Sequence, residues 1–430
     1  MGLTSALFTS VSGLDATGTA IAVIGDNIAN VNTTGYKASR AEFSDILGRM
    51  VSGLGGFSQI GAGTTISGVT PIFSQGTFES TTRTTDLAIE GQGFFVLDGG
   101  QGRFYSRAGV FTFDQSGALV NPAGLRVQGF TIDPATGQST QALGDIQISS
   151  AVSPPRATTA ANVSVNLDAN SLTLGVPFDP ADPNTTSNFR TLMTVYDSIG
   201  NDHLVTYYFT KSAANNWEWT ASVPSADTTT APANPGDSLV VQGSGTLTFD
   251  SNGVLQAATG SPVTFEFSGG ATAGQSVNLG FGPIGGVGTG EVTTQFAGPS
   301  TTNSFNQDGF ATGQIQGIQV DREGFVVGQF SNGETLTLAE VALASFPNAE
   351  GLVKIGSGNL VETRRSGQPS VGAPLTGRLG SIRSNSLEQS NVDLAREFVQ
   401  LIINQRAFQA NARTVSTTNE LMANLVSLGQ

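Results

Sequence analysis

The two ends of the chain carry matching helical stripes of apolar residues, and this feature constrains the fold more than any other. From about Asn391 to Val426, apolar residues recur at alternating spacings of three and four. The members of this stripe that we assign to an interface are Leu394, Phe398, Leu401, Phe408, Val415 and Met422, and polar Gln405 and Asn419 fill two further positions. Such a repeat, near 3.5 residues, is typical of a long helix that packs along other helices. Ser390 and Asp393 have the form of a capping box, which predicts the helix start there.

The N-terminal segment has the same spacing. Its stripe consists of Leu3, Leu7, Leu14, Ile21, Ile24 and Ile28, with Ser10 and Thr17 as weaker members. Gly13, Gly18 and Gly25 disfavour a helix on its own, so packing must supply the order. The two stripes predict an antiparallel or staggered helix pair, or a bundle built from many chains. The alternative is that each helix packs on a local globular core.

Composition excludes several classes of function. The chain has a formal net charge of −14, which argues against a protein that binds nucleic acid by neutralising phosphates. It has no Cys and one His, so we expect no zinc site, no disulfide, no other metal site and no cofactor. That histidine, His203, follows Asp202, but neighbouring residues of a strand point to opposite faces, which favours a structural role.

Between the ends, the pattern is that of β-strands and turns. Three segments, Phe111–Val120, Thr248–Leu255 and Gln319–Val326, each place Asp and then Gly between apolar residues, which predicts three hairpins. Residues 38–70 are rich in Gly and predict a loop-like connection. Residues 151–299 hold both tryptophans and have three basic against eleven acidic residues, which indicates a separate acidic β-lobe.

These observations predict a mixed but mainly β fold. Two outer β-domains are nested between N- and C-terminal helices, which form a coiled-coil-like inner domain. The predicted domains are residues 1–70 with 366–430 for the helices and their connection, 71–150 with 300–365 for the inner β-domain, and 151–299 for the outer insert.

The N-terminal segment does not have the pattern of a secretory leader. Residues 1–36 contain no Lys or Arg, and Gly, Ser and Thr interrupt each apolar run. We also expect no stretch long enough to span a bilayer, and therefore no membrane insertion. If the protein leaves the cell, this predicts export without a cleaved signal peptide.

Three separated motifs make the chain recognisable. They are Asn-Ile-Ala-Asn-Val-Asn-Thr-Thr-Gly-Tyr-Lys at 27–37, Asp-Leu-Ala-Ile-Glu-Gly-Gln-Gly-Phe-Phe at 86–95, and Glu-Gln-Ser-Asn-Val-Asp-Leu at 388–394, which continues through Asn-Gln-Arg-Ala-Phe-Gln-Ala-Asn at 404–411. In this order they resemble the motifs of the bacterial flagellar rod and hook proteins. The first motif is carried by Asn27, Asn30, Asn32, Gly35, Tyr36 and Lys37.

The resemblance implies a structural subunit of the extracellular flagellar hook and no enzyme activity. Its copies would polymerise through both helical stripes into a flexible curved tube, a universal joint that carries motor torque from rod to filament. The implied partners are other copies, the distal rod, hook cap and hook–filament junction proteins, and the type III export apparatus.

Two alternatives remain open from the sequence. A distal rod subunit shares all three motifs, although the large insert at 151–299 favours the hook. An extracellular adhesin or carbohydrate-active enzyme belongs to a different class. Such an enzyme needs paired carboxylates in an aromatic cleft, and Glu218, between Trp217 and Trp219, offers a single one.

Overall fold

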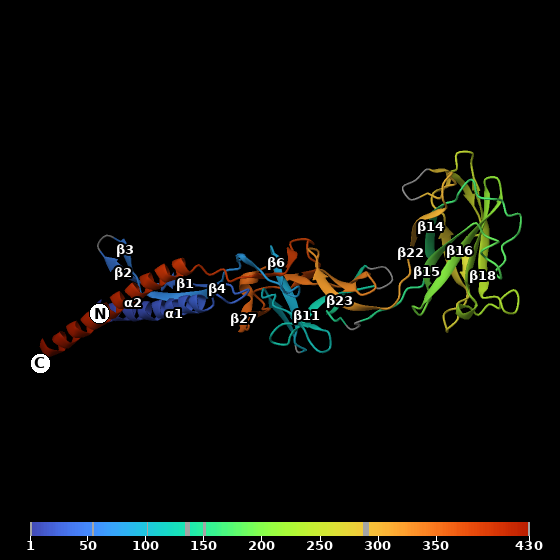
Figure 1. The fold of residues 1–430 in the computed structure, drawn as a ribbon. Helices are drawn as coiled ribbons and strands as arrows, with labels where there is room; N and C mark the ends of the chain where they lie inside the picture. Colours follow the sequence, from blue (N-terminus) through green and yellow to red (C-terminus); the bar gives the residue numbers. More distant parts are fainter. Residues whose placement is uncertain are drawn as a thin grey trace. The chain divides into compact units, whose positions relative to one another are not determined.

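The chain divides into two compact units. The computed structural model describes residues 2–53, 56–100, 102–133, 138–148, 152–286 and 292–428. The first unit comprises residues 1–149, 317–329 and 335–430, and the second comprises 150–316 and 330–334. The expected mainly β chain with a helix at each end is confirmed (Figure 1). The further division of the first unit into a helical and an inner β-domain stays a prediction, and the predicted boundary at 150/151 lies outside the described residues.

The terminal helices pack against each other within one chain. Helix α1 spans Gly2–Ala29 and helix α2 spans Leu394–Leu428. They run antiparallel (Figure 1), with Gly13 beside Asn411 and Gly18 beside Phe408. A Cβ atom on Gly13 would lie 2.6 Å from Nδ2 of Asn411, so this glycine permits the close approach of the two helices. Helix α1 also packs on strands β1 (Ser39–Asp45) and β4 (Thr64–Pro71).

Helix α2 begins differently from the prediction. Oδ1 of Asp393 accepts hydrogen bonds from the backbone N–H groups of Ala395 (3.0 Å) and Arg396 (3.3 Å). Oγ of Ser390 accepts one from Val392, before the helix. Asp393 is therefore the N-cap itself, and the predicted capping box led by Ser390 is wrong. A carboxylate suits this position because it satisfies free N–H groups and complements the helix dipole.

The connection at residues 38–70 is not the predicted loop. Strand β1 pairs with β4, and β2 (Arg49–Gly53) pairs with β3 (Gly56–Ile60), both antiparallel. Gly63, with φ of +114°, lies against α1, where a Cβ atom would lie 2.2 Å from Oγ of Ser12. At Gly63, the lack of a side chain lets the backbone approach the helix closely, and flexibility of the chain is not the reason for the glycine.

The expectation of no bilayer-length stretch is also wrong. Residues Leu3–Ala29 are long and apolar enough to cross a membrane by length and composition alone. In this structure the segment packs on α2 and on the β1–β4 hairpin.

One larger sheet and two separate pairs of short strands build the rest of the first unit. Part of the larger sheet runs in the order β24-β25-β11-β7-β8-β28-β27. The strands of this unit and its border with the second are β5 (Phe78–Ser80), β6 (Leu87–Glu90), β7 (Phe94–Asp98), β8 (Arg103–Ser106), β9 (Thr112–Phe113), β10 (Leu119–Val120), β11 (Arg126–Ile132), β12 (Ser139–Asp145), β23 (Gly313–Val320), β24 (Phe325–Phe330), β25 (Thr335–Val341), β26 (Leu343–Ser345), β27 (Val353–Gly356), β28 (Asn359–Val361), β29 (Ser370–Gly372), β30 (Ser381–Ser384) and β31 (Ser386–Glu388). Buried Phe95 and Phe111 meet edge to face in its core, 5.1 Å apart.

The three predicted hairpins are confirmed. They are the turns between β9 and β10, between β18 (Leu239–Phe249) and β19 (Leu255–Ala258), and between β23 and β24. In each turn the Asp carboxylate accepts a backbone N–H four residues on, and Gly has a positive φ: Asp114 with Gly117, Asp250 with Gly253, and Asp321 with Gly324. Asp therefore closes the turn, and Gly takes the left-handed position.

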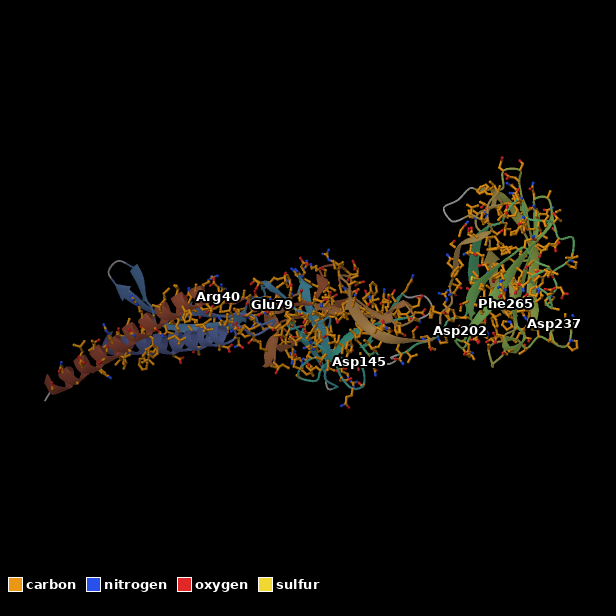
Figure 2. All side chains as sticks on the ribbon, in the orientation of Figure 1. Arg40, Glu79, Asp145, Asp202, Asp237 and Phe265 are labelled. Atoms are coloured by element: carbon orange, nitrogen blue, oxygen red, sulfur yellow. The ribbon has the colours of Figure 1, made fainter. Side chains whose placement is uncertain are left out.

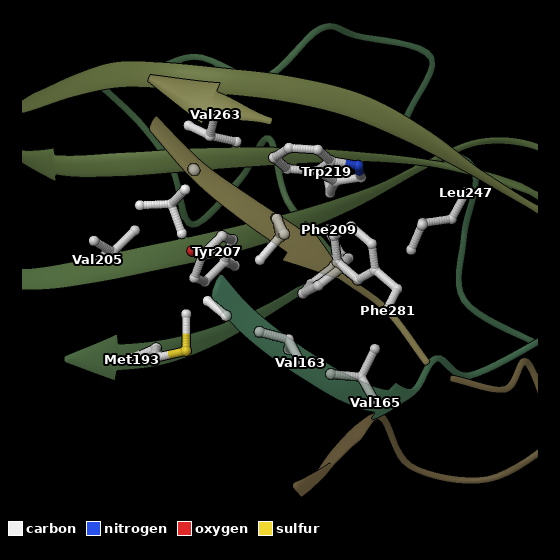
Figure 3. Packing of buried hydrophobic residues seen from close by; sticks show 14 of the residues in the cluster. Val163, Val165, Met193, Val205, Tyr207, Phe209, Trp219, Leu247, Val263 and Phe281 are labelled. Carbon is white, nitrogen blue, oxygen red and sulfur yellow. The ribbon is translucent and has the colours of Figure 1, made fainter. Parts of the chain in front are cut away.

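The second unit is a β-sandwich with an aromatic core. One sheet has the order β15-β16-β17-β18-β19 and the other β20-β21-β14-β22. The strands not yet given are β13 (Val152–Ser153), β14 (Ala160–Asn166), β15 (Phe189–Tyr196), β16 (Asp202–Ala213), β17 (Asn216–Pro224), β20 (Val263–Phe265), β21 (Gln275–Gly280) and β22 (Thr301–Gln307). Tyr207, Phe209 and Trp219 from the first sheet meet Val163 and Val165 from the second (Figure 3). Phe265 lies inside this unit and Asp202 lies at its surface (Figure 2).

The single histidine lies on strand β16, next to a turn of the second unit. His203 is buried and Asp202 is exposed, so strand alternation separates them as predicted. Nε2 of His203 lies 3.2 Å from Oδ2 of Asp197, a fully buried carboxylate. Burial raises the pKa of Asp197, but hydrogen bonds from His203, from Asn201 and from the backbone lower it by more in total. The pKa of Asp197 therefore lies below its usual value.

From the environment of Asp197 we predict how the stability of the second unit changes as the pH falls. Because the folded pKa of Asp197 is depressed, its stabilisation is present above the unfolded pKa of about 3.9 and is lost as pH falls through the folded value. Asp197→Asn should lower the urea midpoint at neutral pH and flatten its decline below about pH 4. Tryptophan fluorescence reports this unit alone, since Trp217 and Trp219 are the chain's two tryptophans. The exposed control Asp202→Asn should keep the parent's acid response, and an equal response of both variants would contradict the assignment.

Candidate functional site

A buried carboxylate connects the terminal helices to the β-region. Glu388, at the end of β31, forms ion pairs with Lys37, which follows α1, and with Arg107, which follows β8. The distances are 2.6 Å from Lys37 Nζ to Oε1 and 3.2 Å from Arg107 Nη1 to Oε2. The three side chains are 3%, 0% and 6% exposed for Lys37, Glu388 and Arg107. We call these three residues the Glu388 cluster.

Backbone groups complete the cluster and bring the three motifs together. The N–H of Gly76 donates to Oε1 of Glu388 (2.9 Å), and Lys37 Nζ donates to the carbonyl of Ser74 (2.8 Å). Arg107 donates to the carbonyls of Ile89 and Gly91, within the second motif. Lys37 belongs to the first motif and Glu388 to the third, so one site holds all three.

The three charged side chains of the Glu388 cluster depend on one another electrostatically. Burial lowers the pKa of the Lys37 ammonium and of the Arg107 guanidinium, and the Glu388 carboxylate opposes both shifts. Two buried cations thus share one buried anion. Removing one member of such a group leaves an uncompensated charge, which is much costlier than loss of a surface pair.

Two asparagine amides fix the backbone beside the cluster. Asn27 donates to the carbonyl of Ser39 and accepts from its N–H, both at 2.8 Å. Asn391 accepts from the N–H of Ala38 (2.8 Å) and donates to the carbonyls of Ile72 (2.8 Å) and Ser74 (3.1 Å). An amide can do both because it carries a donor and an acceptor. These contacts tie the end of α1 and the segment before α2 to the backbone at 38–39, and Asn391 also holds the stretch at 72–74.

The remaining residues of the first motif form a tight turn. Gly35 has φ of +68°, and a Cβ atom there would lie 2.4 Å from the backbone nitrogen of Ala108, so another residue would clash. The Tyr36 hydroxyl donates to Asp26 (2.8 Å), and burial together with this bond raises the pKa of Tyr36. Asn30 also donates to Asp26. Asn32 is exposed.

Lys354 reaches the motif from β27. Its Nζ lies 4.3 Å from the centroid of the Tyr36 ring and donates to the carbonyl of Lys37 (2.7 Å). Sequence reasoning missed the roles of Arg107, Glu388, Asn391 and Lys354. Glu388 and Asn391 lie in the third motif, which was a usable signal, whereas nothing in the sequence pointed to Lys354.

The predicted interface residues divide into two groups. On α1, Ile24 is buried and Leu3, Leu7, Leu14, Ile21 and Ile28 are partly buried. On α2, Leu401, Val415 and Met422 are partly buried, but Leu394, Phe398 and Phe408 are 40%, 50% and 40% exposed. Of the alternatives that the sequence left open, the antiparallel pair is present within the chain, and part of the α2 stripe stays exposed. The assignment of these residues to a polymer interface stays a prediction.

Small and polar side chains make up the less exposed faces of the helices. On α1 these include Ser10, Gly13, Thr17 and Ala20, and on α2 they include Asn404, Asn411 and Thr418. The α2 face is rotated by about one residue from the predicted stripe. Small residues allow the closer helix approach seen at Gly13, and this approach determines the rotation.

The sequence also raised Glu218 as a candidate catalytic carboxylate. Glu218 is exposed on β17. Among the residues described, no group of three or more acidic or histidine side chains could hold a metal ion.

Known families match the chain in four segments. The family described as "Flagella basal body rod protein" matches residues 7–37, and "Flagellar hook protein FlgE/F/G D1 domain" matches 88–170. "Flagellar basal body protein FlaE D2 domain" matches 166–310, and "Flagellar basal body rod FlgEFG protein C-terminal" matches 383–428.

Similar proteins match over nearly the whole length. The chain is 35% identical to the flagellar hook protein FlgE of Borreliella burgdorferi, covering 98% of this chain and 99% of the relative. It is 34% identical to the one of Salmonella typhimurium, covering 97% and 98%. The crystal structure of Helicobacter pylori flagellar hook protein FlgE2 aligns with a TM-score of 0.48 and 16% identity, over 72% of this chain and all of that one.

The Glu388 cluster yields a mutational prediction. Glu388→Gln leaves Lys37 and Arg107 buried without their anion, and we expect the first unit to lose about 3–5 kcal/mol. Far-UV circular dichroism at the helix band would follow its thermal unfolding, since both long helices lie in this unit. Glu42→Gln breaks an exposed ion pair with Arg40 and should leave the midpoint nearly unchanged. Equal effects of the two substitutions would contradict the role of the cluster.

Proposed function

Because the chain belongs to the flagellar hook protein family and is a structural subunit of the hook, we propose that its copies form a flexible curved tube that transmits torque from the rod to the filament. The full-length relatives are hook proteins, which disfavours the distal rod alternative. The proposed tube is a head-to-tail assembly whose rotation does not close, as in helical filaments generally.

The observation that carries this proposal is the outward face of the helix pair. Six large apolar residues of α2 are 40–55% exposed: Leu394, Phe398, Val399, Ile402, Ile403 and Leu421. Phe408 is also 40% exposed, but one edge of its ring lies near Gly18 of α1. On α1, Phe8 is 71% and Val11 is 47% exposed. Large apolar side chains exposed together along a helix pair are typical of an interaction site. In the tube, the helices of neighbouring copies would cover it.

The Glu388 cluster supports the mechanical part of the proposal. Torque passes through a subunit only if its inner and outer parts move together. The cluster and the amides of Asn27 and Asn391 link both helix ends to the sheet through buried contacts. Load on the β-region would therefore reach the helices without local unfolding of the connection.

The second unit supports the proposed flexibility of the tube. It has its own aromatic core, and a unit with a separate core can behave as a rigid body. Bending of the tube requires outer contacts between copies to slide while the helical core stays continuous. We assign the sliding contacts to the outer units and the continuous contacts to the helices.

Finer assignments follow from the family and are part of the proposal. We assign the distal rod, hook cap and hook–filament junction proteins as partners, and the flagellar export apparatus as the route out of the cell. The absence of basic residues before Lys37 supports export without a cleaved leader. Structural function alone is proposed, without catalytic activity.

The outward apolar face yields a test of polymerisation. Phe398→Asp places a charge where the contact between copies should exclude water, and we expect the critical concentration for polymerisation to rise at least about tenfold. Ala123→Asp adds the same charge to an exposed turn of the first unit, outside both helices. It should polymerise almost as the parent does. Sedimentation of polymer at graded concentrations measures both, and normal polymerisation of Phe398→Asp would contradict the proposed interface.

A further inference from the structure

One exposed strip of helix α1 ends in an acidic residue. Phe8, Val11 and Asp15 lie on one face of the helix, because their spacings of three and four residues match its turn. Gly13, which approaches α2, lies on the opposite side. All three residues of the strip are exposed, and Asp15 has no ion pair among the described residues. Residues 1–36 contain no Lys or Arg, so α1 offers this carboxylate no cation of its own. We call these three residues the Asp15 strip.

Helix α2 carries an exposed strip of the opposite charge. Arg396, Val399 and Ile403 also follow one another at spacings of three and four, so they share one face of α2. Val399 is 55% and Ile403 is 54% exposed. Arg396 is exposed and, in the part of the chain that the structure describes, has no ion pair. We call these three residues the Arg396 strip.

The two strips are complementary when their helices run antiparallel. Asp15 comes seven residues after Phe8, and Ile403 comes seven residues after Arg396. The charged residue is therefore last in one strip and first in the other, so an antiparallel alignment matches apolar with apolar and acid with base. The pairs are Phe8 with Ile403, Val11 with Val399, and Asp15 with Arg396. Two apolar contacts and one ion pair then lie along a single seam between two helices.

This pairing cannot form within one chain. There, Gly13 lies beside Asn411, so Val11 lies opposite position 413 of the antiparallel helix. Val399 is 413 − 399 = 14 residues from that position, which is roughly 20 Å along the helix. An Arg396 strip that faces the Asp15 strip therefore belongs to a second copy. Copies in a head-to-tail tube point the same way, so α1 of one copy meets α2 of another antiparallel, as the pairing requires.

We propose that the Asp15 strip of one copy packs antiparallel on the Arg396 strip of a second copy, and that the Asp15–Arg396 ion pair fixes the register of the two helices. The inference rests on the proposed tube and specifies one contact that holds it together. Apolar burial contributes affinity, whereas the ion pair disfavours shifted registers, in which unpaired charges would lie in the contact. Relative to the pairing within one chain, the helices of the second copy are displaced by roughly 20 Å along their axes.

Exchanging the two charges tests the ion pair and the register. Asp15→Arg and Arg396→Asp each place like charges opposite one another, and each should raise the critical concentration for polymerisation at least about fivefold. The double variant restores opposite charges and should return to within about twofold of the parent. Arg413→Asp is the matched control, since Arg413 is exposed on α2 but lies beyond the start of the docked α1, so it should not rescue Asp15→Arg. No rescue by Arg396→Asp, or equal rescue by Arg413→Asp, would overturn the pairing.

Single cysteines locate the contact between copies directly. The chain has no native cysteine, so copies with Val11→Cys can be mixed with copies that carry Val399→Cys. Because a disulfide needs Cβ atoms about 4 Å apart, oxidation should give the mixed dimer, identified by mass spectrometry, in polymer and not in monomer. The control pairs Val11→Cys with Leu421→Cys, which is exposed but faces no residue of α1 in this register, and should give no dimer. Polymer without the mixed dimer overturns the inference and leaves the proposed tube intact, whereas a parent chain that forms no polymer overturns the proposed function.

Discussion

The structure of the first unit depends on the charge of one buried carboxylate. Glu388 holds two cations that lie 351 and 281 residues away in the chain, and its backbone carbonyl accepts the N–H of Gly35. Buried ion pairs contribute little net stability compared with apolar packing, but they are specific, because a misplaced partner leaves a charge without compensation. The cluster therefore fixes the segment that follows the first helix and the segment that precedes the last one against the sheet.

The helix pair places different types of residue on different faces. Small and polar side chains face inward, so α1 and α2 approach closely within one chain. Several large apolar side chains, such as Phe8, Phe398 and Ile402, are exposed, and a monomer gains nothing from them there. Covering these residues stabilises only an assembly of many copies, and at about 25 cal/mol per Å² such burial can drive polymerisation. Intrachain order and interchain affinity thus use different faces of the same helices.

Much of this could be predicted from the sequence, and the failures have physical causes. Terminal helices, three Asp–Gly hairpins and the β-lobe with its tryptophans follow from local patterns. The Glu388–Arg107 contact does not, because no periodicity relates residues so far apart. The apolar stripe of α2 did not indicate which residues face α1, because the close backbone approach at Gly13 places Asn411 there. Gly63 likewise suggested a loop, although it packs against Ser12 of the helix.

The central claim is that α2 has one face for its own chain and another for its neighbours. The chain has no native cysteine, so single cysteines at 398, 402, 404 and 411 can each be labelled with a maleimide in monomer and in polymer. The account predicts slow labelling at 404 and 411 in both states, and at 398 and 402 fast labelling in monomer that becomes at least about tenfold slower in polymer. Labelling of 398 and 402 that stays fast in the polymer, or of 404 and 411 that matches them in the monomer, would contradict it.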